Sequence, residues 1–140
     1  DRKDDAPLAE MAAAIVAEFS ARRQPIPGIG HPLHKPIDLR TPVLFDIAGR
    51  NGFRGQYVAL LEEIAKQAEV RLKRELPINA TGAIGAILCE LDFPWRICRG
   101  IAVISRAVGL VGHLSEEMQN PLAREIWERA EQEVFDNREQ

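Results

Sequence analysis

The sequence has few of the residues that mark several protein classes. Of its 140 residues two are cysteines and one is tyrosine, and aromatic residues make up 6% of the chain. The net charge of −3 lacks the basic excess that is typical of nucleic-acid-binding proteins. No apolar run approaches the roughly 20 residues of a membrane span, because the most apolar stretch, 101–114, contains Arg106 and His113. We therefore expect neither a nucleic-acid nor a membrane partner.

The two cysteines, Cys89 and Cys98, lie in helix-like segments without a metal-binding or redox motif. We interpret them as buried free thiols of a reducing compartment, which favours a cytoplasmic location. The chain starts at Asp1 with the charged segment DRKDD and shows no signal-peptide pattern. This start indicates a processed chain or a fragment of a longer protein.

No segment alternates as a strand does, so the pattern predicts an all-α fold of one domain. Leu8, Met11, Ile15 and Phe19 predict the apolar stripe of a first helix. Thr41 and Thr81 are expected to cap two later helices. The expected helices cover 7–22, 41–49, 55–75, 82–92, 94–118 and 121–138. The fifth is apolar nearly all round, which predicts a buried central helix.

A segment rich in proline and glycine, PIPGIGHPLHKPIDLR at 25–40, separates the first two helices. His31 and His34 have a metal-like spacing, but Pro32 lies between them and no further ligands complete a set, so we expect no metal site. A neutral His31 that donates a hydrogen bond to a substrate carbonyl suits the segment better. The alternative is a loop histidine bonded to a backbone carbonyl.

Cationic side chains suggest an anionic ligand. Arg106 lies among apolar neighbours, where it either forms a structural ion pair or grips a carboxylate, and Arg40 and Arg124 are candidates to join it. Lys35 either meets a phosphate or is simply solvated. The INATG segment at 78–82 either binds an anion through its N–H groups or only begins a helix.

Three motifs in order, PGIGHPLHKPIDLR, LPINATGAIGAIL and VISRAVGLVGHLSEE, resemble the carboxyl-terminal half of the citrate synthase family, most closely its citryl-CoA lyase-like branch. The resemblance covers about Pro27 to Arg124. It implies a helical small domain plus the closing helices of the large domain. Residues 1–140 would then be the C-terminal part of that fold, without its N-terminal half.

The resemblance also implies roles for individual residues. His31 matches the histidine that bonds the oxaloacetate carbonyl, and Lys35 falls near the CoA phosphates. Three arginines match carboxylate ligands, the last of them contributed to the neighbouring subunit of a dimer: Arg40, Arg106 and Arg124. Four residues match the backbone that lines the CoA adenine: Pro27, Gly28, Ile29 and Gly30.

Two departures from the family pattern concern catalysis. Thr81 stands where citrate synthases have the aspartate that takes a proton from acetyl-CoA, and a hydroxyl is too weak an acid for that role, although some lyase-like relatives also carry Ser or Thr there. Thr81 is instead expected to orient a water or bond the thioester oxygen. The family's other catalytic histidine belongs to a segment upstream of this chain.

The resemblance implies an enzyme that makes or breaks a carbon–carbon bond between an acyl-CoA and a 2-oxo acid. The substrates would be acetyl-CoA and oxaloacetate, or citryl-CoA, with no metal, in a homodimer. Two alternatives remain open. One is a CoA- and carboxylate-binding module that performs no chemistry, and the other is a helical dimerisation module.

Overall fold

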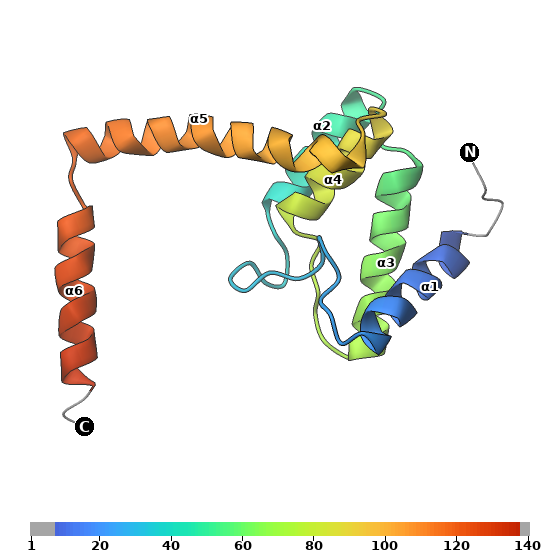
Figure 1. Ribbon diagram of the computed structural model, residues 1–140, viewed down its shortest axis with the longest axis horizontal. Coiled ribbons are helices and arrows are strands. Elements are labelled where there is room, and N and C mark those ends of the chain that lie inside the picture. Colours follow the sequence, from blue (N-terminus) through green and yellow to red (C-terminus); the bar gives the residue numbers. More distant parts are fainter. Residues whose placement is uncertain (1–7, 138–140) are drawn as a thin grey trace. The chain divides into compact units, whose positions relative to one another are not determined.

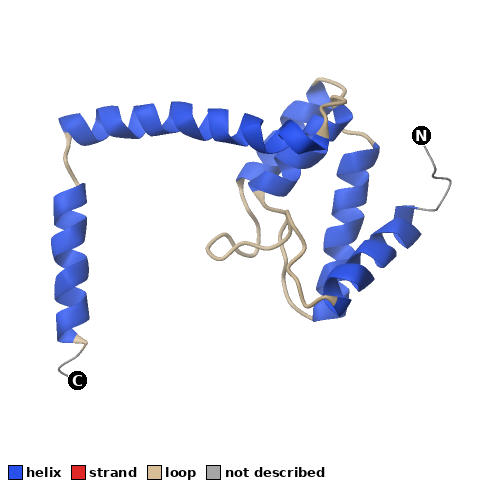
Figure 2. Ribbon diagram, in the orientation of Figure 1, coloured by secondary structure: helices blue, strands red, loops and turns tan. Residues whose placement is uncertain are grey.

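The chain is built of α-helices, as the computed structural model shows for residues 8–137 (Figures 1 and 2). The elements are α1 (Leu8–Ala21), α2 (Arg40–Arg50), α3 (Gln56–Leu72), α4 (Ala80–Glu90), the 3-10 turn η1 (Trp95–Ile97), α5 (Cys98–Gln119) and α6 (Ala123–Asp136). Within these residues there is no strand, only an isolated antiparallel bridge between Ile29 and Ile78. The all-α prediction is confirmed. Two compact units divide the chain, the first ending at Arg99 and the second beginning at Gly100.

In the first unit α1 packs against α3, while α4 packs against both α2 and α3. Small residues at these contacts let the helix axes approach closely. One core cluster has Ala12, Val16, Ile29, Ile64, Ala65, Ala68 and Leu76, and a second has Phe45, Val58, Ala83 and Ala86. The buried face of α1 differs from the predicted one. Ala12 and Val16 are its buried residues, whereas the four side chains of the predicted stripe are only half-buried: Leu8, Met11, Ile15 and Phe19.

Both predicted N-caps are wrong. The helix α2 begins at Arg40 after Leu39, and the buried hydroxyl of Thr41 donates a 2.8 Å hydrogen bond to the carbonyl of Ile78 instead of capping. Asn79 caps α4, because its side-chain oxygen accepts a hydrogen bond from Gly82 N at 3.1 Å. Thr41 is therefore used to fasten α2 to the segment that enters α4.

The glycine-rich part of the first loop lies against the start of α4. Gly30 N donates to the carbonyl of Pro77 at 2.7 Å, and Asn79 N donates to the carbonyl of Gly28 at 3.0 Å. Gly28 has a φ of +84°, and a Cβ added to it would lie 2.7 Å from the Gly82 Cα. Two glycines are therefore required here, because two backbone segments touch without side chains between them.

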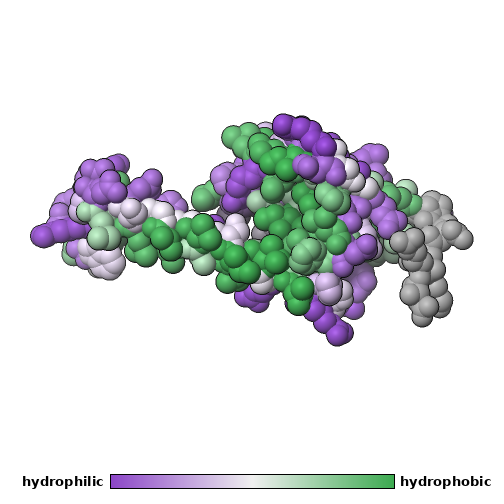
Figure 3. Space-filling model, turned by 90° about the horizontal axis from the view of Figure 1, so that it is seen from above, coloured by the Kyte–Doolittle hydropathy of each residue, from purple (hydrophilic) through white to green (hydrophobic). Residues whose placement is uncertain are grey.

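The prediction of a buried fifth helix is wrong for this chain, in which all but the first two residues of α5 belong to the second unit. None of the α5 residues is buried, and Val103, Val108 and Val111 are 59%, 70% and 68% exposed. Apolar surface runs along the helix in Figure 3. The stretch from Trp95 to Gln119 is long and apolar enough to cross a membrane, judged by length and composition only, which the sequence pattern did not indicate. The described chain supplies no element that covers this surface.

The last helix, α6, has a similar unpartnered face. Ile126, Trp127 and Phe135 are exposed, and α6 has no buried residue. Its charged side chains pair along the helix, as in the 2.7 Å contact between Arg124 Nε and Glu128 Oε1. The amphipathic pattern predicted for this helix is therefore present, but its apolar side has no cover among residues 8–137.

Candidate active site

The ring of His31 is oriented by the loop that carries it. Its Nδ1 accepts hydrogen bonds from the backbone N–H groups of Leu33 at 3.1 Å and His34 at 3.0 Å. Because Nδ1 is an acceptor, the neutral ring carries its proton on Nε2. The ring is half-buried, so Nε2 is available as a hydrogen-bond donor. The alternative considered from the sequence was a loop histidine that donates a hydrogen bond to a backbone carbonyl. In the described chain the ring instead accepts hydrogen bonds from backbone N–H groups.

Arg40 is held by a carboxylate that the sequence analysis did not single out. Its Nε donates to Oδ1 of Asp38 at 2.8 Å, and its Nη2 donates to Oδ2 at 2.7 Å. This two-point contact fixes the plane of the guanidinium. It uses two of the five N–H groups that an arginine offers. The other three remain to bind a ligand carboxylate.

Asp38 is completely buried, and every one of its partners is a donor. Besides the Arg40 side chain, it accepts hydrogen bonds from Arg40 N at 3.2 Å and from Ala80 N at 3.0 Å. The hydrogen-bonded Arg40 guanidinium holds the pKa of this carboxyl well below its usual value. An aspartate two residues before an arginine at a helix start was the available signal, but sequence alone does not show the burial.

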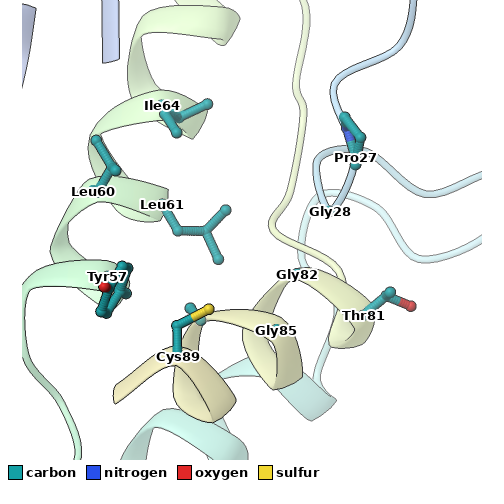
Figure 4. A pocket seen from close by; sticks show the side chains of 11 residues that line it. Pro27, Gly28, Tyr57, Leu60, Leu61, Ile64, Thr81, Gly82, Gly85 and Cys89 are labelled. Carbon is teal, nitrogen blue, oxygen red and sulfur yellow. The ribbon is translucent and has the colours of Figure 1, made fainter. Parts of the chain in front are cut away.

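A pocket of about 300 Å³ lies between α3, α4 and the first loop (Figure 4). Its walls are mostly apolar: Tyr57, Leu60, Leu61 and Ile64 come from α3, Thr81, Gly82, Gly85, Ala86 and Cys89 from α4, and Pro27 and Gly28 from the loop. The structure thus brings together three of the predicted residues, Pro27, Gly28 and Thr81. Ile29 is buried in the adjacent core, and Gly30 pairs with Pro77 beside it.

Thr81 lies exposed in the first turn of α4, and in Figure 4 its side chain extends away from Leu61 and Cys89. The neighbouring N–H groups of this turn are occupied, because Ala80 N donates to Asp38 and Gly82 N donates to Asn79. The INATG segment therefore serves mainly as a capped helix start, which was the plainer of the two expectations.

Glu90 is a second residue that the sequence analysis missed. Its Oε1 accepts hydrogen bonds from the N–H groups of Gly55, Tyr57 and Val58 at 3.1, 2.7 and 3.0 Å. This carboxylate at the end of α4 therefore caps the start of α3 and positions Tyr57, which lines the pocket. No local pattern reveals it, because 32 or more residues separate the partners.

The two cysteines are free thiols, as predicted, but both are half-buried and not fully buried. Cys89 lines the pocket, and burial raises the pKa of its thiol. Its neighbour Cys98 makes a 3.7 Å contact from Sγ to the carbonyl of Pro94. Both thiols belong to the first unit, near the junction of α4 and η1.

The remaining predicted residues are not among those that line this pocket of the first unit. Lys35 is exposed on the loop. Arg106 is exposed on α5 without an ion partner in residues 8–137, and Arg124 is paired with Glu128 on α6. Convergence of Arg106 and Arg124 with His31 stays a prediction. The rings of His31 and His34 lie with their centroids 4.4 Å apart and their planes tilted by 50°, and the described residues contain no group of three or more potential metal ligands.

Comparisons with known proteins identify the family of the chain. Residues 3–129 match the family model described as citrate synthase, C-terminal domain. The chain is similar to a citrate synthase of Helicobacter pylori, with 31% identity over 69% of this chain and 25% of that protein. It is also similar to a citrate synthase of Dictyostelium discoideum, with 26% identity over 79% of this chain and 23% of that protein.

A solved structure shows the same fold. The chain superposes on a citryl-CoA lyase from Hydrogenobacter thermophilus with a TM-score of 0.69 and 34% identity, covering 83% of this chain and 44% of that one. The chain thus spans about a quarter of the curated relatives and less than half of the solved relative. The family match covers more than half of the chain and includes both the His31 loop and α4. The chain belongs to the citrate synthase family.

Proposed function

We propose that this chain is the carboxyl-terminal part of an enzyme that forms or cleaves the carbon–carbon bond between acetyl-CoA and oxaloacetate, with citryl-CoA as the condensed species. Residues 1–140 would supply the small domain and the closing helices, and a longer chain would supply the rest. The family match supports the reaction class. The two free thiols support a cytoplasmic location.

The tautomer of His31 carries this proposal. Two backbone N–H groups occupy Nδ1, so the neutral ring presents Nε2–H as a donor. A donor fixed in this way is suited to the oxygen of a 2-oxo acid, which gains negative charge when its carbon is attacked. In the cleavage direction the same donor stabilises the oxygen as the carbonyl forms again.

Arg40 would bind a carboxylate of the oxo acid. Its guanidinium is fixed by Asp38 and keeps three N–H groups for a ligand. Arg106 and Arg124 would complete the anion site in the assembled enzyme, Arg124 from the neighbouring subunit. Oxaloacetate has two carboxylates, which is consistent with more than one arginine.

The loop 27–30 and the apolar pocket would hold the CoA thioester. Pro27 and Gly28 lie at the edge of the pocket, and an exposed backbone next to apolar walls suits an adenine ring. Lys35 on the same loop would meet a CoA phosphate. Thr81 would orient a water or bond the thioester oxygen, because its hydroxyl does not act as a carboxylate base near neutral pH.

The exposed face of α5 would be covered by protein in a homodimer. The family model extends through α5 and into α6, up to residue 129. Exposed large apolar side chains that run along a helix, as on α5, mark an interaction surface in a soluble protein. We therefore assign the apolar stretch 95–119 to a protein interface and not to a membrane.

The test is the conversion of citryl-CoA to acetyl-CoA and oxaloacetate, and its reverse, by the full-length protein. His31→Ala should lower kcat about 100-fold or more, since removal of one donor to a developing oxyanion has that effect. His34→Ala is the matched control on the same loop and should retain most of the activity. Equal, small losses in both variants would contradict the role of His31.

A second candidate is a binding module that holds CoA and a carboxylate without chemistry. The observation that favours it is Thr81, which supplies no carboxylate at the edge of the pocket. Isothermal titration of the full-length protein separates the two functions. Binding of CoA and oxaloacetate, with neither formation nor cleavage of citryl-CoA, would replace the proposed enzyme by this module.

A further inference from the structure

The two free thiols of the chain lie next to each other at the end of α4. Cys89 is in the last turn of α4, and Cys98 is the first residue of α5. The chain folds back between them, because Phe93 N donates to the carbonyl of Leu88 at 2.9 Å and η1 packs against α4. Burial raises the pKa of the Cys89 thiol, and contact with the Cys98 thiol raises it further. The fold therefore brings together two thiols that are separate in the sequence.

A pair of adjacent thiols can bind a metal ion or form a disulfide. Structural zinc sites need four ligands. Residues 8–137 contain no group of three or more potential metal ligands. The carboxylate of Glu90, which follows Cys89, already accepts three backbone N–H groups at its Oε1. Oxidation of the pair to a disulfide is therefore the chemistry that these residues support.

We propose that Cys89 and Cys98 are a site of reversible oxidation, which joins them in a disulfide and alters the wall of the acyl-CoA pocket. Two S–H bonds break and one S–S bond forms. The two electrons and two protons pass to a thiol oxidant such as a low-molecular-weight disulfide, which is released as two thiols. In a reducing compartment a disulfide of this kind is transient and senses the redox state. The effect on acyl-CoA rests on the proposed function, whereas the oxidation itself does not.

Cys89 connects the thiol pair to the pocket. It lines the cavity of about 300 Å³, and in Figure 4 its sulfur points into the space between α4 and Leu61. Cys98 is not among the lining residues. Because an S–S bond is much shorter than a contact between two thiols, the disulfide would draw the sulfur of Cys89 toward Cys98 and change the pocket wall. His31 and Arg40 do not line this cavity, so the oxo-acid ligands should be unaffected.

The test is peptide mapping of the full-length protein after treatment with diamide, an azo compound whose N=N bond takes up the two hydrogens of a thiol pair. Trypsin cuts after lysine and arginine, which places Cys89 in the peptide 75–96 and Cys98 in the peptide 97–99. Mass spectrometry without reduction should find these two peptides joined, and dithiothreitol should separate them. Two free peptides after diamide treatment, or either cysteine joined to a different segment, would overturn the inference.

Steady-state kinetics measure the effect on the pocket. We expect the KM for the acyl-CoA substrate to change about threefold or more in the oxidised protein and to return after dithiothreitol, because the pocket wall contributes to substrate binding. The KM for oxaloacetate should change less than about 1.5-fold. Cys98→Ser cannot form the bond and is the matched control, in which diamide should change neither KM. Joined peptides with an unchanged acyl-CoA KM would overturn the control of the pocket.

Failure of the proposed function gives a different result. If the full-length protein neither forms nor cleaves citryl-CoA, the joined peptides still report the oxidation. Isothermal titration of CoA into the reduced and the oxidised protein then replaces the kinetics, and equal Kd values would overturn the control of the pocket. Normal catalysis without joined peptides refutes the inference alone and leaves the proposed function intact.

Discussion

Replacement of Gly82 by alanine tests the contact between the first loop and α4. A Cβ at this position would lie 2.6 Å from the carbonyl oxygen of Gly28 and 2.8 Å from its Cα. Both neighbours are backbone atoms and cannot rotate away. The loop is also tied by the hydrogen bonds from Asn79 to Gly28 and Gly30, at 3.0 and 2.8 Å. Gly82→Ala must therefore strain this contact or break it.

The size of the effect follows from two opposing terms. Heavy atoms in contact prefer separations of about 3.5 Å or more, so the loop must retreat by about 1 Å. Overpacking of this kind costs about 1–3 kcal/mol. Alanine gains about 1 kcal/mol over glycine in a helix. Gly85 lies one turn later in α4 and has nothing within 4 Å of an added Cβ, so Gly85→Ala gains helix propensity alone.

The difference between Gly82→Ala and Gly85→Ala cancels the helix-propensity term and leaves the clash. Urea unfolding of the full-length protein should show Gly82→Ala less stable than Gly85→Ala by about 1–3 kcal/mol. Gly85→Ala itself should be as stable as the parent protein or more stable. Equal free energies of unfolding for the two variants would refute the close approach of Gly28 and Gly82.

Three further predictions concern carboxylates at the site. Glu90→Ala leaves the N–H groups at the start of α3 without their acceptor and should lower the free energy of unfolding in urea by about 2 kcal/mol. The control Glu128→Ala removes an exposed ion pair on α6 and should lower it by less than about 0.5 kcal/mol. Equal losses in the two variants would contradict the capping role of Glu90. Thr81→Asp should speed hydrogen exchange at the acetyl-CoA methyl group, measured by NMR, and an unchanged rate would place the base elsewhere. The hydrogen-bonded Arg40 guanidinium lowers the pKa of Asp38 in the folded protein. The ionised carboxylate therefore contributes its full stabilisation above the unfolded-state pKa of about 3.9, and this contribution decreases as the pH falls below that value. Loss of stability below about pH 4 should therefore be weaker in Asp38→Asn, and an identical acid transition would argue against the buried pair.

Helix positions were predictable because local patterns determine them. The six helices were expected from apolar periodicity and from the proline and glycine residues that end them, and all six are present with ends shifted by a few residues. The caps were predicted less well. Thr41 has the right side chain for an N-cap, but a distant carbonyl, that of Ile78, accepts its hydrogen bond. Tertiary contacts of this kind override a local preference.

For the candidate site, the sequence predicted the residues of the loop but not the residues that hold them in place. Sequence motifs indicated His31, Arg40 and the loop around Gly28. The partners that fix them, Asp38 and Glu90, became visible only in three dimensions, because burial and long-range hydrogen bonds leave no periodic pattern. The fifth helix was expected to be buried because it is apolar nearly all round. It is exposed in this chain since residues 8–137 supply no cover for it.

The most direct test of the proposed chemistry is a structure of the intact assembly with oxaloacetate bound. We expect Nε2 of His31 within about 3 Å of the oxo oxygen, as for a donor to a developing charge. The N–H groups of Arg40 that Asp38 leaves free should contact a carboxylate of the same molecule. An oxo acid bound elsewhere, or a His31 ring whose Nε2 faces away from it, would contradict the account.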